Sequence, residues 1–294
     1  MNAVYRSHAF LLTTALIAGF NYTISKLVMP LYIQPSAIVV VRVVLAAAFF
    51  WLVDLFFKRE QLDFRKDLPR IALCGFFGVG ANQLLFYSGL NLTSPINASL
   101  IMTTCPVLVL IASAILLEER VTIIKVTGIA LGAAGASLLL LSSHSNVDQG
   151  MFLGDFMIFL NASCYAVFLV LVKPLLARYR ALTIAKWLFL LGCFYVIPFG
   201  YQEVMQTSWN TIPIFAGLAF GYIIIFNTII AYYFNVNVMK YVNASVAGIY
   251  IYLQPMLATT IAIGFGRDVL TPQKIISSLL IFGGVFLVSR KSKG

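Results

Sequence analysis

Apolar residues follow one another in long runs along this chain, and short polar segments separate the runs. A helix needs about 20 mostly apolar residues to cross the hydrocarbon core of a bilayer. The regular alternation of apolar and polar residues that marks a transmembrane β-barrel is absent. The pattern therefore predicts an all-α membrane protein with ten transmembrane helices, over about 8–28, 36–57, 69–90, 95–117, 123–141, 153–176, 181–200, 212–236, 244–265 and 272–289.

The amino-acid composition supports this prediction. Of the 294 residues, 61% are apolar and only 10% are charged. An ordinary soluble domain has about 45–50% apolar and about 25% charged residues. A soluble fold of this length could not bury so much apolar surface, so we expect the lipid bilayer to surround most of the protein.

The distribution of positive charge predicts the orientation in the membrane. The net charge is +10, and Lys and Arg gather in alternate connections between the apolar runs. Such connections lie on the cytoplasmic side, so we expect both termini in the cytoplasm of a cell with a bacterial-type inner membrane, and no nucleic-acid partner. Only the segment 266–274, with Arg267 and Lys274, breaks the pattern. The positive residues that fit this pattern are Lys58, Arg59, Arg65, Lys66, Arg70, Arg120, Lys125, Lys173, Arg178, Arg180, Lys240, Arg290, Lys291 and Lys293.

Common catalytic and metal-binding motifs are absent from the sequence. The chain contains neither H-E-x-x-H nor G-x-S-x-G, and its two histidines are far apart. The four cysteines lie singly inside apolar runs, at Cys74, Cys105, Cys164 and Cys193. We therefore expect no enzyme activity, no catalytic residue, no metal site and no cofactor.

The chain repeats one phrase, "PVLVLIASAILLEERVT" at 106–122 and "PMLATTIAIGFGRDVLT" at 255–271. A shift of 149 residues aligns this part, and a shift of 144 aligns the earlier part, where Arg42 falls on Lys186. The sequence thus predicts two five-helix halves, 1–142 and 143–294, with an insertion in or near the third and eighth helices. Because five is odd, the second half must be inverted in the bilayer, an arrangement that recurs in secondary transporters.

Both halves resemble the EamA domain of the drug/metabolite transporter superfamily. The resemblance lies in "TSPINASLIMTTCPVLVLIASAILLEERVTIIKVTGIALGAAG" and "VNASVAGIYIYLQPMLATTIAIGFGRDVLTPQKIISSLLIFGGVFLVSR". Each has a helix rich in small residues, a central proline, a charged pair and a Gly-rich last helix. The resemblance implies ten helices in inverted halves and the export or exchange of small metabolites. The second copy departs from the first at Arg267 and Asp268, where the first has Glu118 and Glu119, which weakens a shared role for this pair.

Uncharged polar side chains inside the apolar runs are the candidates for substrate binding. Each is costly in lipid and should face the helix bundle, where it bonds another helix or contacts a substrate. We add Gln254, which lies beside Pro255, to these candidates. We also add tyrosines on the helices that, as the resemblance implies, line the pocket. The full set is Asn21, Tyr22, Ser25, Asn82, Gln83, Tyr165, Asn227, Tyr250 and Gln254. Amide, hydroxyl and aromatic groups together suit amino acids or similar amphipathic compounds.

Three cations lie about a third of the way into predicted helices, at Lys26, Arg42 and Lys186. Each could reach the interface or bond a neighbouring helix, or it could bind a substrate carboxylate or phosphate. Because Arg42 and Lys186 match across inverted halves, they should approach opposite membrane faces, which favours gate or mouth positions. No Asp or Glu lies deep in an apolar run, so no carboxylate relay for protons is predicted.

Prolines and glycines mark the helices of each half. Pro106 and Pro255 fall near the middle of predicted helices. Proline removes a backbone donor and frees a carbonyl group, so each is either a packing kink or a hinge beside the pocket. The stretch "GIALGAAG" at 128–135, with Gly283 and Gly284, predicts close packing of the fifth and tenth helices. A contact in a homodimer is the alternative.

The predicted function is export or exchange of small organic metabolites by alternating access. One half would rock against the other around a pocket lined by helices 1, 3, 4, 6, 8 and 9. Helices 2 and 7 would act as gates, and helices 5 and 10 as supports. The alternative is a nucleotide-sugar or phosphorylated-metabolite antiporter of the same fold, in which Lys26, Arg42 and Lys186 would bind phosphate. We expect a small-molecule substrate and a monomer or homodimer.

Overall fold

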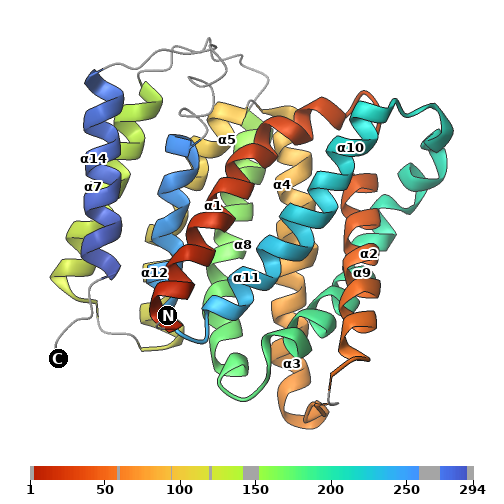
Figure 1. Cartoon of the computed structure of the whole chain (residues 1–294), viewed down its shortest axis with the longest axis horizontal. Coiled ribbons are helices and arrows are strands. Elements are labelled where there is room, and N and C mark those ends of the chain that lie inside the picture. Colours follow the sequence, from red (N-terminus) through yellow and green to blue (C-terminus); the bar gives the residue numbers. More distant parts are fainter. Residues whose placement is uncertain are drawn as a thin grey trace.

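The computed structural model describes residues 3–57, 60–93, 95–118, 121–141, 152–257 and 272–289. Helices account for most of these residues, and the described part of the chain contains no strand. The helices stand side by side in a bundle (Figure 1). They are α1 (Ala3–Val28), α2 (Pro35–Asp54), α3 (Phe64–Gly75), η1 (Phe76–Gly80), α4 (Ala81–Leu92), α5 (Pro95–Met102), α6 (Cys105–Leu116), α7 (Ile123–Leu141), α8 (Phe152–Leu176), α9 (Ala181–Gln206), η3 (Trp209–Thr211), α10 (Ile214–Tyr222), η4 (Ile223–Ile230), α11 (Ala231–Val238), α12 (Ala244–Ile249), η5 (Tyr250–Tyr252) and α14 (Pro272–Ser289).

Six continuous helical segments are long and apolar enough to cross a membrane, which confirms an all-α membrane fold for the described residues. Four further apolar helices are shorter than a full crossing, so the count of ten crossings stays a prediction. The long segments are Tyr5–Val28, Pro35–Asp54, Arg65–Leu92, Phe152–Leu176, Ala181–Gln206 and Ile214–Val238. The shorter ones are Cys105–Leu116, Ile123–Gly135, Ala244–Leu257 and Ile275–Gly284.

The predicted helix over 95–117 is broken in two, and this corrects the prediction of one continuous span. A turn at Thr103 and Thr104 separates α5 from α6, and Pro106 lies in the first turn of α6. Proline has no backbone N–H, and it is tolerated in the first turn of a helix because that N–H has no intrahelical partner there. Pro255 has a similar setting, since the 3₁₀ turn η5 precedes it. The remainder of the predicted helix over 244–265, beyond residue 257, lies outside the described residues.

Two segments wind more widely than an α-helix. The π-helical turns η1 and η4 lie in the middle of the helical segments Arg65–Leu92 and Ile214–Val238. In η4 the Thr228 hydroxyl donates a hydrogen bond to the Ile223 carbonyl at 2.8 Å, so it satisfies an acceptor of the widened turn. Such turns are frequent at functional sites.

Helices of the first half pair with helices of the second half, and the partners run in opposite directions. At one end of the α2–α9 pair, the ring centroids of Phe50 and Phe189 lie 5.4 Å apart. At the other end, Glu203 accepts hydrogen bonds from the first residues of α2. The helices α7 and α14 also form an antiparallel pair, seen side by side in Figure 1.

The pairing of α7 and α14 depends on glycine. A Cβ atom at Gly284 would lie 2.5 Å from the Gly128 carbonyl oxygen and 2.8 Å from the Gly132 nitrogen. Only the absence of a side chain permits this approach of two backbones. The predicted close packing of these two helices is therefore confirmed at Gly284, whereas a Cβ at Gly283 would meet nothing within 4 Å.

The remaining long helices show the same exchange between halves. The Tyr222 hydroxyl donates to the Ile17 carbonyl at 3.0 Å, so α1 packs against the segment α10–η4–α11. In the same manner α8 packs against α3, η1 and α4. The first long helix of each half thus packs against the π-containing helix of the other half. The cavity described below lies between the two halves.

Candidate substrate cavity

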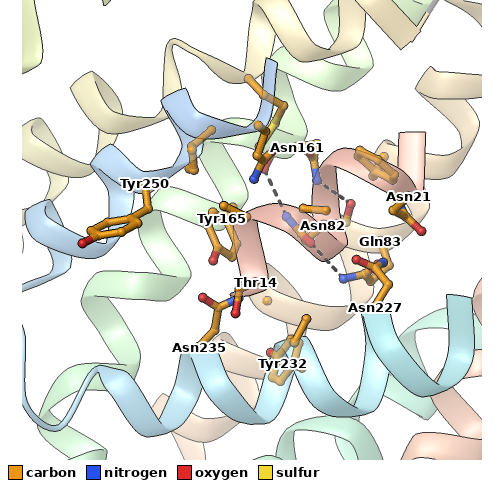
Figure 2. A pocket seen from close by; sticks show the side chains of 18 of the residues that line it. Thr14, Asn21, Asn82, Gln83, Asn161, Tyr165, Asn227, Tyr232, Asn235 and Tyr250 are labelled. Atoms are coloured by element: carbon orange, nitrogen blue, oxygen red, sulfur yellow. Dashed lines mark hydrogen bonds between the residues drawn. The ribbon is translucent and has the colours of Figure 1, made fainter. Parts of the chain in front are cut away.

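A cavity of about 140 Å³ lies where α1, α2, η1, α4 and α5 of the first half meet α8, η4, α11, α12 and η5 of the second. Its wall is mixed, with amides, tyrosines, small apolar residues and one arginine. The residues that line it are Leu11, Thr14, Ala15, Ala18, Asn21, Tyr22, Arg42, Gly78, Asn82, Gln83, Phe86, Met102, Asn161, Tyr165, Asn227, Ala231, Tyr232, Asn235, Ala247, Tyr250, Ile251 and Gln254. Figure 2 shows many of these side chains from close by.

Two asparagines hold the first and second halves together at this cavity. The Asn82 amide nitrogen donates to the Asn161 backbone carbonyl at 3.2 Å, and the Asn161 amide nitrogen donates to the Asn82 carbonyl at 2.8 Å. Gln83 donates to the Asn82 side-chain oxygen at 3.1 Å (Figure 2). The Asn161 side-chain oxygen is buried and has no partner. These bonds fix the two amides in the wall of the cavity.

A second set of polar contacts surrounds α1. The Tyr22 hydroxyl donates to the Gln254 side-chain oxygen at 3.2 Å. The Ser25 hydroxyl donates to the Asn21 side-chain oxygen at 3.3 Å, and the Tyr87 hydroxyl approaches the same oxygen at 3.4 Å. Buried polar groups in an apolar surrounding need such partners, and these contacts orient Asn21 and Gln254 at the cavity wall.

Aromatic side chains form much of the remaining wall. Tyr165, Tyr232 and Tyr250 come from the second half, and Figure 2 shows Tyr165 and Tyr232 close to Asn235. The Tyr250 hydroxyl lies 2.6 Å from His8 Nδ1. The Tyr232 hydroxyl is buried and has no partner. A tyrosine wall offers apolar faces together with polar tips, which suits an amphipathic ligand.

Arg42 borders the cavity and is only 1% exposed. Its Nε donates to the Thr228 hydroxyl at 2.7 Å, and its guanidinium carbon lies 4.9 Å from the centroid of the Tyr87 ring. Its Nη1 has no hydrogen-bond partner. The sequence favoured a gate or mouth for this residue; the structure places it in the wall of the cavity, and a gating role for it stays a prediction.

The other two predicted mouth charges lie away from the cavity. Lys186 forms a buried ion pair with Asp54 at 2.5 Å, and its Nζ lies 4.9 Å from the centroid of the Trp51 ring. Lys26 is half-buried and donates to the Asn91 carbonyl at 3.0 Å. Both therefore make helix-to-helix contacts, and a gating role for them stays a prediction.

Eight of the nine candidate polar residues border the cavity, and Ser25 is the exception because it lies behind Asn21. The predicted hinge prolines Pro106 and Pro255 are buried outside the lining, and their movement stays a prediction. Sequence reasoning missed four polar residues of the wall, which are Thr14, Asn161, Tyr232 and Asn235. Each lies inside an apolar run, so the signal that marked Asn82 was present for them too.

The described residues that line the cavity include no carboxylate, and no cluster of metal-binding side chains occurs in the same part of the chain. Among the described lining residues, Arg42 alone carries a full charge. The wall can therefore offer hydrogen bonds, aromatic faces and a single positive charge. It offers no carboxylate to a proton or an organic cation.

Comparison with known proteins places the chain in a family. The model of the EamA-like transporter family matches residues 6–141 and again residues 152–290. The chain belongs to the EamA-like transporter family. It is a multi-pass membrane protein, and the two matches show that the family domain occurs twice, as the resemblance noted in the sequence implied.

Relatives of this EamA-like transporter are also named as transporters. An uncharacterized transporter, YyaM of Bacillus subtilis, is 25% identical over 96% of this chain and 93% of its own length. A probable terminal-alkyne amino-acid exporter of Streptantibioticus cattleyicolor is 26% identical over 78% of this chain and 75% of its own. A crystal structure with 20% sequence identity superimposes with a TM-score of 0.76 over 96% of both chains, which shows a shared fold.

Proposed function

We propose that this EamA-like transporter exports or exchanges small amphipathic metabolites, amino acids or close analogues, and is not an enzyme. The observation that carries the proposal is the cavity between the two halves, whose wall combines amides, tyrosines and one arginine. The name of the exporter from Streptantibioticus cattleyicolor, which refers to an amino acid, supports the same class of substrate. A substrate of this kind has an apolar part for the tyrosines and polar groups for the amides.

The proposed mechanism is alternating access between two inverted halves, 1–142 and 143–294, with ten crossings in all. The antiparallel pairing of α2 with α9 and of α7 with α14 supports inverted halves. In Figure 1 the start of α1 lies at the same end of the bundle as the end of α14, and as the connections from α8 to α9 and from α11 to α12. Those two connections contain Arg178, Arg180 and Lys240, so we place this end in the cytoplasm, with the protein in the inner membrane as a monomer or homodimer.

Two glutamates support the roles of α2 and α9 as gates. Glu203, near the end of α9, accepts hydrogen bonds from the backbone N–H groups of Ser36 and Ala37 at 3.0 and 3.1 Å. Glu60, after α2, accepts from the N–H group of Arg180, just before α9, at 2.9 Å. Each glutamate caps the positive end of the opposite helix. Hydrogen bonds of this kind therefore join α2 and α9 at both ends of the pair. We propose that the bonds at one end break in each access state.

A nucleotide-sugar antiporter is less well supported. The cavity volume of about 140 Å³ is well below the roughly 300–1,000 Å³ of pockets that enclose drug-sized ligands. The three cations that would have bound phosphate are also separated, because Lys186 is paired with Asp54 and Lys26 lies outside the lining. We therefore retain the small-metabolite function alone.

The proposal is tested by transport into proteoliposomes that contain the purified full chain and unlabelled amino acids. Labelled L-leucine and other small amino acids should exchange into these vesicles, and Ala18→Trp should abolish the exchange because the large ring fills the cavity. Leu12→Trp is the matched control, since Leu12 lies on the exposed face of α1. Exchange should not require a pH gradient, because the described residues of the lining include no carboxylate. Full activity in A18W would contradict the proposal.

A further inference from the structure

Among the described residues that line the central cavity, one is positively charged and none is negatively charged. Arg42 keeps its proton under all ordinary conditions, and it is 1% exposed. Removing a cation from water is costly unless an opposite charge and hydrogen bonds compensate. The described residues that line the cavity include no Asp or Glu, so none of them supplies such a charge.

The contacts of Arg42 compensate only part of this cost. Nε uses the Thr228 hydroxyl, which in turn donates to the Ile223 carbonyl. The Tyr87 side chain lies beside the guanidinium and stabilises the cation through its ring and through a hydrogen bond with its hydroxyl. Both partners are neutral, and Nη1 is left without a partner. The Thr228 and Tyr87 contacts fix the guanidinium, and the buried Nη1 has no acceptor within the protein.

The second half of the chain provides an internal comparison. Lys186 occupies the position that matches Arg42, and it is also buried, but Asp54 neutralises it at 2.5 Å. Under the same shift of 144 residues, the counterpart of Asp54 is Pro198, which has no side-chain charge. The buried cation of the second half, Lys186, therefore finds an acid in the first half, whereas Arg42 finds no acid at the matching position of the second half. Of the two cations, it is Arg42 that borders the cavity.

We propose that Arg42 binds the carboxylate group of the transported molecule. This inference rests on the proposed transport function and narrows its substrate class to small monocarboxylates and zwitterionic amino acids. A guanidinium presents two parallel N–H donors that match the two oxygens of a carboxylate. An amino group in the same cavity meets only amide and hydroxyl oxygens, so it contributes less. Organic cations are excluded because they would add a second positive charge.

The test measures binding with four probes that differ in charge and share one branched side chain. L-Leucine is the zwitterion, 4-methylpentanoate lacks its amino group, 3-methylbutylamine lacks its carboxylate, and 4-methylpentanamide is neutral. Binding to the purified full chain in detergent is measured by isothermal titration calorimetry. L-Leucine and 4-methylpentanoate should bind, and the amine and the amide should bind at least about tenfold more weakly, because an unpaired buried charge is costly. Equal affinity for the amine, or binding of neither carboxylate, would overturn the inference.

Two substitutions assign the effect to Arg42. Arg42→Gln should weaken binding of both carboxylates at least about tenfold and leave the affinity for the amide unchanged. Arg42→Lys keeps the charge without the paired donors and should retain part of the affinity. Arg70→Gln is the matched control, because it removes the same charge from an exposed position. Should R42Q fail to fold, R42K decides alone, and unchanged carboxylate affinity in R42K would overturn the inference.

Transport distinguishes this inference from the proposed function. Proteoliposomes with the wild-type chain that move none of the amino acids would contradict the proposed function. Wild-type exchange of L-leucine that persists at full rate in R42Q would leave the function standing and would overturn the carboxylate site. Loss of L-leucine exchange in R42Q, with normal exchange in R70Q, would support both.

Discussion

At the scale of single residues, the two buried cations show how partners decide the role of a charge. Lys186 has a carboxylate beside it and serves as a contact between α9 and α2. Arg42 has a hydroxyl and an aromatic ring beside it and keeps an open donor. Because a buried charge needs compensation, Lys186 has its counter-charge within the protein, and we propose that Arg42 receives one from the carboxylate of a bound molecule.

The Lys186–Asp54 pair predicts strong coupling between two substitutions. Lys186→Met should lower the free energy of unfolding by about 3–5 kcal/mol, because the buried Asp54 charge then has no partner. Asp54→Leu alone should be similarly harmful, and the double variant should regain most of the loss. The measurement is unfolding of the detergent-solubilised protein in a denaturant series. Losses that simply add in the double variant would contradict a direct pair.

The sequence predicted the lining residues better than the depth of the charges. Asn21, Asn82 and Gln83 could be predicted because an amide inside an apolar run must find a polar surrounding. The position of Arg42 could not, because distance from a helix end does not say whether a side chain reaches water or a neighbouring helix. That depends on which helices pack together, and Thr228 lies 186 residues away in the chain.

At the scale of helices, backbone contacts explain where the elements meet. The α7–α14 pair depends on Gly284, whose missing side chain allows the backbone of α7 to lie close. Gly284→Ala should lower the free energy of unfolding by about 1–3 kcal/mol, since the new methyl group meets backbone atoms that must move. Gly283→Ala is a close control, because nothing lies within 4 Å of its Cβ position. Thermal unfolding should separate the two variants, and equal effects would contradict the observed packing.

The cap on α2 predicts a local effect of a distant glutamate. Glu203→Ala should destabilise the first turn of α2 by about 0.5–2 kcal/mol, the usual cost of losing a helix cap. Glu203→Gln keeps an acceptor oxygen and loses the charge, so its effect should be smaller. Hydrogen exchange at the Ser36 and Ala37 amides measures the opening. Gln202→Ala, at an exposed neighbouring position, is the control and should leave that exchange unchanged. Unchanged exchange in E203A as well would contradict the role of the cap.

Helix positions followed from the sequence more readily than helix interruptions. Long apolar runs predicted the six long helices because a crossing needs a fixed length of apolar chain. Pro106 indicated a disturbance of the helix. A kinked helix and a fully broken helix both accommodate the loss of a backbone N–H, so the sequence could not distinguish them. The π-helical turns η1 and η4 could not be predicted, because they depend on how one extra residue is accommodated against neighbouring helices.

At the scale of the whole molecule, the two halves are interlocked rather than adjacent. The first long helix of each half packs against the π-containing helix of the other, and the cavity is built from both. The sequence repeat predicted two equivalent halves, and the lining shows where they differ. Asn21 falls on Tyr165 under the shift of 144 residues, so the cavity is asymmetric and can hold an asymmetric molecule in one orientation.

Thiol labelling of the cavity from each membrane face tests alternating access most directly. Gln83→Cys is made in a chain whose four native cysteines are replaced by alanine, and a membrane-impermeant maleimide is added to one face at a time. Leu12→Cys, on the exposed side of α1, should stay unlabelled because lipid surrounds it. Alternating access predicts that the introduced thiol at position 83 is labelled from either face, and more slowly when L-leucine is bound. Labelling from one face alone, with and without L-leucine, would contradict the account.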